Sequence, residues 1–328
     1  MNQNQVAPRE RRGPLAILPL VLAGTLVFTT GTRAAEWIER PFDPSVGSRW
    51  VIQSNETTED NRDGRVQTSV ATMTAELTIE QKLVDGFRIT YVVRNASYVG
   101  DARSTALIGP ATKALENLVI HAMTAANGMP LRIENLEQVQ ATARTAIDNM
   151  TAPLASKPEE AAILRQMATR VLLADNQHAP AIYLATLVAL ALGQNTGMRP
   201  GETRNNDDDA TNPFSGAPIK SNTSLRIGNA DPATGSVRYI RTRTFDSDAI
   251  KAFLTKLAQQ LGGTDSQHSQ PIDNMMKQFT MALDSRTEIE VEDGITRTLR
   301  QEDTATAGTP GRSIVKHGHK LIMVMPAP

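Results

Sequence analysis

Apolar and polar residues alternate from position 76 to position 94, on both sides of an Asp85-Gly86 pair. A period of two places the apolar residues on one face of a β-strand, and an Asp-Gly pair favours a tight hairpin turn. The pattern therefore predicts a hairpin with one apolar and one polar face. The apolar positions are Leu77, Ile79, Leu83, Phe87, Ile89, Tyr91 and Val93.

Similar patterns predict antiparallel strands toward both ends of the chain, with turns at Asp63-Gly64, Asn127-Gly128 and Asp293-Gly294. Between and beside them, helical spacing predicts several helices, with Asn135 as an N-cap and Pro158 in a first turn. The predicted strands and hairpins span 48–59, 66–83, 87–99, 117–135, 223–245, 286–303 and 312–324. The predicted helices span 136–150, 158–174, 179–193, 248–263 and 271–283.

The segment 179–193 is apolar on nearly all sides, which is too apolar for a surface helix and too short for a membrane span. We interpret it as a buried helix that covers the sheet. The pattern leaves open whether it closes a solid core or roofs a cavity. The alternative is a helix that inserts into a membrane or binds a partner.

Strands, helices, strands, a helix and strands follow one another, which favours an α+β fold. We expect an antiparallel β-meander and hairpins that form one or two curved sheets packed on helices, with a loose repetition in two halves. The expected domains are 35–204, with the meander and a helical segment, and 223–328, a second hairpin–helix–hairpin region. A polar acidic loop over 205–222 would join them, and the alternative is one continuous domain.

The N-terminal segment 1–34 has the three parts of a secretory signal peptide. Arginines at its start precede a mostly apolar run over 14–28, and small residues precede an expected cleavage after Ala34. The apolar run is shorter than the roughly 20 residues that span a bilayer. We therefore expect a periplasmic or secreted bacterial protein with no membrane span after cleavage. The alternative is that the signal is retained as an anchor.

Composition narrows the function classes. The chain has no cysteine, which excludes disulfides, cysteine metal sites and thiol nucleophiles. Its formal charge is −1 and aromatic residues make up 4%, so it lacks the basic, aromatic surface expected of a nucleic-acid binder. No phosphate-binding loop, dinucleotide fingerprint or nucleophile elbow occurs in the sequence, and we expect no cofactor.

Two short segments contain residues that could hold a metal ion. Asp207 and Asp209 lie in the acidic run over 205–212, but no register of this run has the glycine and glutamate of a calcium loop. His317 and His319 are two apart, so on a strand both rings face one way and could chelate zinc or copper. We favour a solvated loop and an exposed strand or turn instead.

The alternation of glutamate and apolar residues over 288–292 has a simple explanation. Glu288, Glu290 and Glu292 share one face of a predicted strand, and Ile289 and Val291 share the other. Paired carboxylates can act as an acid and a base when one is desolvated. Here the alternation itself predicts a solvent-facing polar side.

These observations favour an exported, non-enzymatic protein that binds an apolar small molecule or a lipid, or another envelope protein. The first alternative is an exported hydrolase whose site is assembled from distant residues, because a catalytic triad leaves no fixed linear motif. The second is a structural surface protein. The ligand, the oligomeric state and the number of domains are not set by the sequence pattern.

Overall fold

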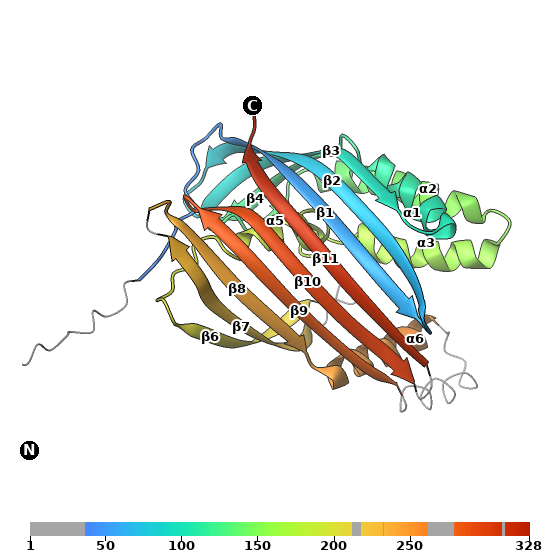
Figure 1. Cartoon of the computed structure of the whole chain (residues 1–328). Helices are drawn as coiled ribbons and strands as arrows, with labels where there is room; N and C mark the ends of the chain where they lie inside the picture. The colour runs from blue at the N-terminus through green and yellow to red at the C-terminus, as the bar shows by residue number, and fades with distance from the viewer. Residues whose placement is uncertain (1–36, 212–217, 232, 262–278, 310–311) are drawn as a thin grey trace, which may run out of the picture. The chain divides into compact units, whose positions relative to one another are not determined.

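The described residues contain one antiparallel sheet of 11 strands, in the order β5-β4-β3-β2-β1-β11-β10-β9-β8-β7-β6 (Figure 1). The computed structural model describes residues 37–211, 218–231, 233–261, 279–309 and 312–328. The strands are β1 (Arg49–Arg62), β2 (Arg65–Lys82), β3 (Gly86–Val99), β4 (Val119–Ala125), β5 (Pro130–Ile133), β6 (Thr203–Thr211), β7 (Pro218–Asp231), β8 (Ser236–Phe245), β9 (Thr280–Glu292), β10 (Ile295–Thr309) and β11 (Arg312–Pro326).

The chain enters this sheet in the middle and leaves it in the middle. From β1 it meanders outward to β5 at one edge, then crosses through helices to β6 at the other edge and meanders back. The last strand, β11, pairs antiparallel with the first, β1, from Trp50 opposite Pro326 to Arg62 opposite Ile314. Figure 1 shows these two strands side by side. The sheet therefore depends on a contact between the two ends of the described chain.

The helices lie in three groups along the sequence. One follows β3, four segments connect β5 to β6, and one follows β8. They are α1 (Ala102–Ala114), α2 (Leu136–Thr151), a short 3-10 turn (Ala152–Leu154), α3 (Pro158–Leu172), α4 (Ala179–Tyr183), α5 (Ala185–Ala191) and α6 (Ser247–Leu261).

The expected fold class, an α+β fold with one or two curved sheets packed on helices in two loosely repeated halves, is wrong. Strands hold 51% and helices 26% of the structure, and the strands form a single large meander rather than two sheets or two halves. Helices contact the sheet at separate places, α1 on β3, α5 on β10 and α6 on β7 and β9. They form no continuous layer because the apolar residues do not extend along the whole length of the strands. The far halves carry residues such as Asp60, Gln67 and Asp303.

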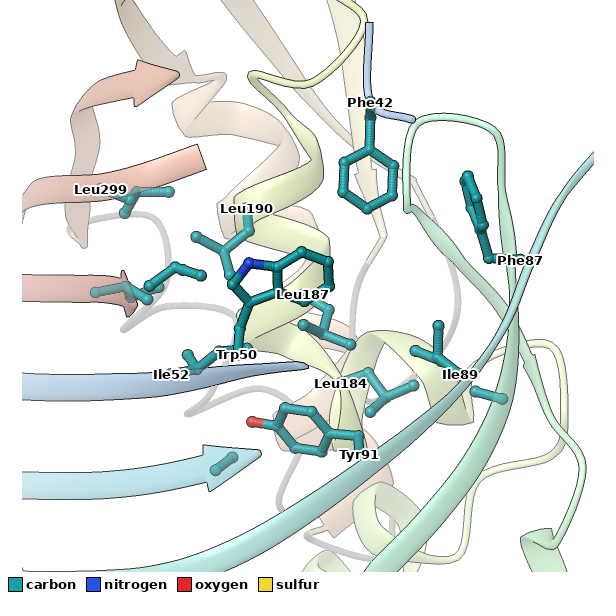
Figure 2. Close-up of a cluster of buried hydrophobic side chains, with 14 of the residues drawn as sticks. Phe42, Trp50, Ile52, Phe87, Ile89, Tyr91, Leu184, Leu187, Leu190 and Leu299 are labelled. Carbon is teal, nitrogen blue, oxygen red and sulfur yellow. The ribbon is translucent and has the colours of Figure 1, made fainter. Parts of the chain in front are cut away.

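The core lies on one face of the sheet, which we call the inner face, and it holds Trp50 and Ile52 of β1. Leu184, Leu187 and Leu190, from α5 and the residue before it, join the same cluster (Figure 2). Fully burying one such leucine stabilises the fold by about 1.5–3 kcal/mol. At the end of the cluster, the rings of Phe42 and Phe87 pack edge to face with centroids 5.4 Å apart.

The turns that the sequence indicated at Asp63-Gly64 and Asp293-Gly294 are confirmed. The hairpin between β2 and β3 is also confirmed, but its turn lies over 83–85, because Gly86 already belongs to β3. Asp293 and Gly294 have φ values of 50° and 75°, which are the positive values that a type I′ hairpin turn requires. The strands on either side alternate as predicted, with Ile289 and Val291 buried on the inner face.

Two helical predictions are confirmed with changes in detail. Asn135 does precede α2, but its side chain does not cap the helix: Oδ1 accepts from the His121 backbone N–H and Nδ2 donates to the Val119 carbonyl. The segment 179–193 is two helices, α4 and α5, because Leu184 between them leaves helical geometry, with φ −117° and ψ 26°.

Two other predictions are wrong. The expected acidic loop over 205–222 lies largely in strands, because the residues of β6 pair with those of β7, Asp207 opposite Asn222. The expected helix over 271–283 is contradicted at Thr280–Leu283, which belong to β9, and 271–278 lie outside the described residues. Helix α1 was not predicted at all. The expected signal peptide over 1–34 lies outside the described residues.

Candidate functional site

The structure places the sequence-derived metal candidates on two distant strands. His317 and His319 lie on β11, and His317 Nδ1 is 3.4 Å from Thr304 Oγ1. Asp207 and Asp209 lie on β6, where Asp207 is exposed and the side chain of Asp209 is outside the described part. Five strand spacings separate β6 from β11, which is about 24 Å along the sheet. The two pairs therefore do not meet.

In the part of the chain that the structure describes, no three histidine or carboxylate side chains come together as metal ligands. The described histidines outside β11 have other neighbours. His121 Nδ1 is 3.0 Å from Thr90 Oγ1, and His178 Nδ1 is 2.7 Å from Asp175 Oδ1. His268 lies outside the described residues.

Glu288, Glu290 and Glu292 lie on the face opposite the core, the outer face, as the alternation predicted. Arg286 Nη2 donates to Glu288 Oε1 at 2.8 Å, and this hydrogen bond lowers the pKa of the Glu288 carboxyl below its usual value. A carboxylate held in its ionised form by a neighbouring guanidinium is poorly suited to act as a general acid. The three glutamates therefore form part of the polar, outer face of the sheet and are not interpreted as an acid–base pair.

Two hollows lie on the inner face, beside α5. The first, which we call the apolar pocket, has a volume of about 280 Å³. Side chains of β2, β3 and the helices α3 to α5 line it, together with residues at the end of α1. Its apolar walls include Met73, Tyr91, Val93, Leu115, Leu172 and Ile182.

Two tyrosines of the apolar pocket are held neutral. Tyr91 is 1% exposed, and burial raises the pKa of its phenol far above the usual value, an effect that a hydrogen bond with Thr186 partly opposes. Its hydroxyl donates to Met73 Sδ at 3.6 Å. Burial raises the pKa of Tyr183 to about 12, and its hydroxyl donates to the Leu172 carbonyl. The pocket wall therefore carries no charge from either ring.

The second hollow, which we call the polar pocket, has a volume of about 410 Å³. Strands β8 to β11 and β1 form its floor, and Ala189 and Leu192 contribute from α5 and its C-cap. Its charged lining residues are Glu56, Arg241, Arg243, Asp303 and Lys316. Each pocket is close to or within the usual size of small-molecule sites, about 300–1,000 Å³.

Residues of β7 and β8 contact the two arginines of the polar pocket. Arg243 Nε donates to Ser221 Oγ at 2.8 Å, and its guanidinium carbon lies 4.9 Å from the centre of the Phe245 ring. Arg241 Nη2 donates to Thr223 Oγ1 at 3.4 Å. These contacts hold both guanidinium groups on the inner face of the sheet.

Sequence reasoning missed these pocket residues, although it came close at one position. In the segment Lys316–Lys320 it singled out His317 and His319, which share the outer face. Alternate residues of a strand face opposite sides, so Lys316 and Gly318 line the polar pocket instead. The apolar helix segment over 179–193 was the other signal, because α5 borders both pockets.

None of the helices that the structure describes combines the length and the apolar composition that a bilayer crossing requires.

Comparison with known proteins identifies no family for this chain. No protein-family model matches the sequence. No curated protein sequence matches it.

Several solved structures match this chain at low similarity. A structure of lipovitellin, titled for its lipid–protein interactions, is 9% identical with a TM-score of 0.43 and covers 87% of this chain, which spans only 26% of the lipovitellin chain. DynF from the dynemicin biosynthesis pathway of Micromonospora chersina is 8% identical, with a TM-score of 0.21 and coverage of 90% and 88%. An outer membrane channel from Pseudomonas putida is 9% identical, with a TM-score of 0.18 and coverage of 87% and 98%. At these values no functional argument follows from the similarity.

Proposed function

We propose that this chain is an exported, non-enzymatic protein of the bacterial envelope that binds an apolar small molecule or a lipid in the apolar pocket. The observation that supports the proposal is the pocket itself, a hollow of about 280 Å³ beside the apolar core. Displacing water from apolar walls is favourable by about 25 cal/mol per Å². A ligand with an apolar body gains this free energy on binding.

The neutral tyrosines support the same ligand class. A buried phenol that stays protonated offers a single hydroxyl, and in Tyr91 and Tyr183 that hydroxyl already donates to a protein atom. The pocket therefore presents mainly ring and aliphatic surface, although polar residues such as Glu56, Thr72 and Lys320 also line it. This composition is typical of sites that bind a ligand by shape and apolar contact.

Export is proposed from the sequence of the first 34 residues. Cleavage after Ala34 would leave a mature chain that begins at Ala35 and carries a formal charge of −4, because the removed segment holds four arginines and one glutamate. Native mass spectrometry, which detects a bound ligand, also identifies the residue at which the mature protein begins.

The test is native mass spectrometry, followed by extraction with organic solvent, on protein purified from its own cell envelope. We expect a protein mass that begins at Ala35, and an additional bound mass that the solvent removes. A mass that begins at Met1 in the soluble fraction would contradict export. A protein mass with no bound species would contradict the proposal that a ligand is tightly held.

A pair of variants links the bound mass to the apolar pocket. Ala71 lines this pocket from β2, whereas Ala282 is exposed on the outer face of β9. Ala71→Phe places a ring in the pocket, and we expect the bound fraction to fall at least about tenfold, the effect of losing about 1.4 kcal/mol. Ala282→Phe adds the same ring elsewhere on the sheet and should leave the bound fraction unchanged. Equal binding by both variants would place the ligand outside the apolar pocket.

A further inference from the structure

The lining of the apolar pocket includes one pair of oppositely charged side chains, Glu56 and Lys320. Glu56 lies on β1 and Lys320 on β11, and the strand register places the two residues directly opposite each other. Glu56 Oε2 is 3.3 Å from Lys320 Nζ, so the two side chains form an ion pair. The other described residues that line the pocket have uncharged side chains.

The ion pair lies at one end of the apolar pocket. The lining runs across the sheet from Lys320 on β11, through β1, β2 and β3, to Ile120 on β4. Four strand spacings separate β11 from β4, which is about 19 Å. Ile120 is 0% exposed, whereas the side chains of Lys320 and Glu56 are 23% and 48% exposed. A ligand that lies across these strands therefore has one end among buried apolar side chains and the other at the ion pair.

The ion pair disfavours a head group of either charge. A carboxylate that approaches the Lys320 ammonium also approaches the Glu56 carboxylate, which is in contact with the same ammonium. An ammonium that approaches Glu56 meets Lys320 in the same way. Like charges at such short distances repel each other, and a charged head group also loses hydration on entering the pocket.

An uncharged hydroxyl group matches both members of the ion pair. A hydroxyl has one hydrogen to donate and two lone pairs that accept. It can therefore donate to the Glu56 carboxylate and accept from the Lys320 ammonium while the ion pair stays intact. Each of these hydrogen bonds has a charged partner, and such bonds are stronger than those between two neutral groups.

We propose that the ligand of the apolar pocket is an uncharged lipid with a hydroxyl head group, which binds at the ion pair of Glu56 and Lys320. The apolar chain of the lipid extends from this pair toward Ile120. The inference rests on the proposed function, and it adds the charge of the ligand, its head group and its direction in the pocket.

The test compares three ligands that share a ten-carbon chain and differ in the charge of the head group. Decanol, decanoate and decylammonium are titrated into the purified protein by calorimetry, below their micelle-forming concentrations. At about pH 7.5 the carboxyl group is ionised and the amine is protonated. We expect decanol to bind at least about tenfold more tightly than either charged ligand, because each of these meets a like charge at the ion pair.

Decanoate or decylammonium that binds as tightly as decanol would overturn the inference and leave the apolar-ligand function standing. If none of the three ligands binds, the proposed function fails and the inference fails with it.

Two variants test whether the ion pair sets this preference. Glu56→Gln leaves Lys320 without its partner, and we expect decanoate to gain at least about tenfold relative to decanol. Lys320→Gln leaves Glu56 without its partner, and decylammonium should gain by a similar factor. Partly exposed ion pairs contribute little to stability, so both variants should fold.

Other charges near the pocket stay the same in these comparisons. They include Arg144 of α2, which acts on the Tyr183 phenol from outside the lining. The change in relative affinity therefore measures the effect of the ion pair itself.

Matched controls make the same changes of charge away from the pocket. Glu59 is exposed on the outer face of β1, and Lys82 forms an ion pair with Asp43 at the end of β2. Glu59→Gln and Lys82→Gln should retain the preference for decanol. Relative affinities that are the same in the pocket variants as in these controls would overturn the inference, because the head group would then bind elsewhere.

Discussion

At the residue scale, another segment of backbone lies very close to Gly294 in the turn between β9 and β10. A Cβ at this position would lie 1.8 Å from the carbonyl oxygen of Pro41, and the residue also has a φ of +75°. Gly201 has a similar φ of +82° but open space around it. Comparing an alanine substitution at each glycine therefore distinguishes the cost of a positive φ from the cost of a steric overlap.

We predict that Gly294→Ala destabilises the protein by about 2–5 kcal/mol, because strain from positive φ adds to overpacking against Pro41. Gly201→Ala should cost only about 1–2 kcal/mol, the strain alone. Denaturant unfolding of both variants measures the difference. Equal losses of unfolding free energy in the two variants would mean that Pro41 moves away at little cost.

At the element scale, helix α5 and the residue before it connect the pockets to the core. Leu184 is 0% exposed and joins the cluster beneath the helix, whereas Leu131 on β5 is 55% exposed. Replacing each leucine with alanine therefore compares the loss of a buried side chain with the loss of an exposed one.

Leu184→Ala should lower the free energy of unfolding by about 2–5 kcal/mol, because it removes a buried side chain and leaves a cavity. Leu131→Ala should change it by less than about 0.5 kcal/mol. Thermal or urea unfolding gives both values. A small effect at Leu184 would show that α5 can settle into the vacated space.

Local signals explain which elements could be predicted from the sequence. The hairpin around Asp85-Gly86 was predictable because its alternation and its turn residues agree. Strand β6 was not, because the run from Asn205 to Asp209 consists of residues with low strand propensity, and it becomes a strand by pairing with β7. Helix α1 contains Gly109 and Pro110, which argue against a helix. The available signal was Asp101, whose side chain accepts from the backbone N–H groups of Arg103 and Ser104.

The site was less predictable than the fold, because its residues are brought together by strand order. Glu56 and Lys320 are neighbours only because β1 pairs with β11. Arg243 and Asp303 share a pocket only because β8 to β10 lie in succession. No spacing along the chain encodes these pairings, so the sequence indicated an apolar ligand through 179–193 without indicating the charged residues of the polar pocket.

At the scale of the whole sheet, the central pairing of β1 with β11 should determine which regions open together. Each of these strands has a hydrogen-bonded neighbour on both sides, whereas β6 has β7 on one side and no described strand on the other. Edge strands open locally at lower cost than central ones.

We predict that backbone amides of β1 and β11 exchange with solvent deuterium together and most slowly, through opening of the whole sheet. Amides of β6 should exchange faster, by fraying at the edge. Hydrogen exchange followed by mass spectrometry of peptides measures both. Protection in β6 equal to that in β11 would indicate a partner that covers this edge.

The central pairing also has a consequence for the timing of biosynthesis. Arg62 at the end of β1 and Arg312 at the start of β11 are 250 positions apart in the chain. At a synthesis rate of about 5–20 residues per second, the nascent β1 waits roughly 10–50 s for its partner. Until then one of its edges presents unpaired N–H and C=O groups, which are a template for aggregation. The nascent chain therefore exposes this edge for a long interval, which ends when β11 has been synthesised and can pair with β1.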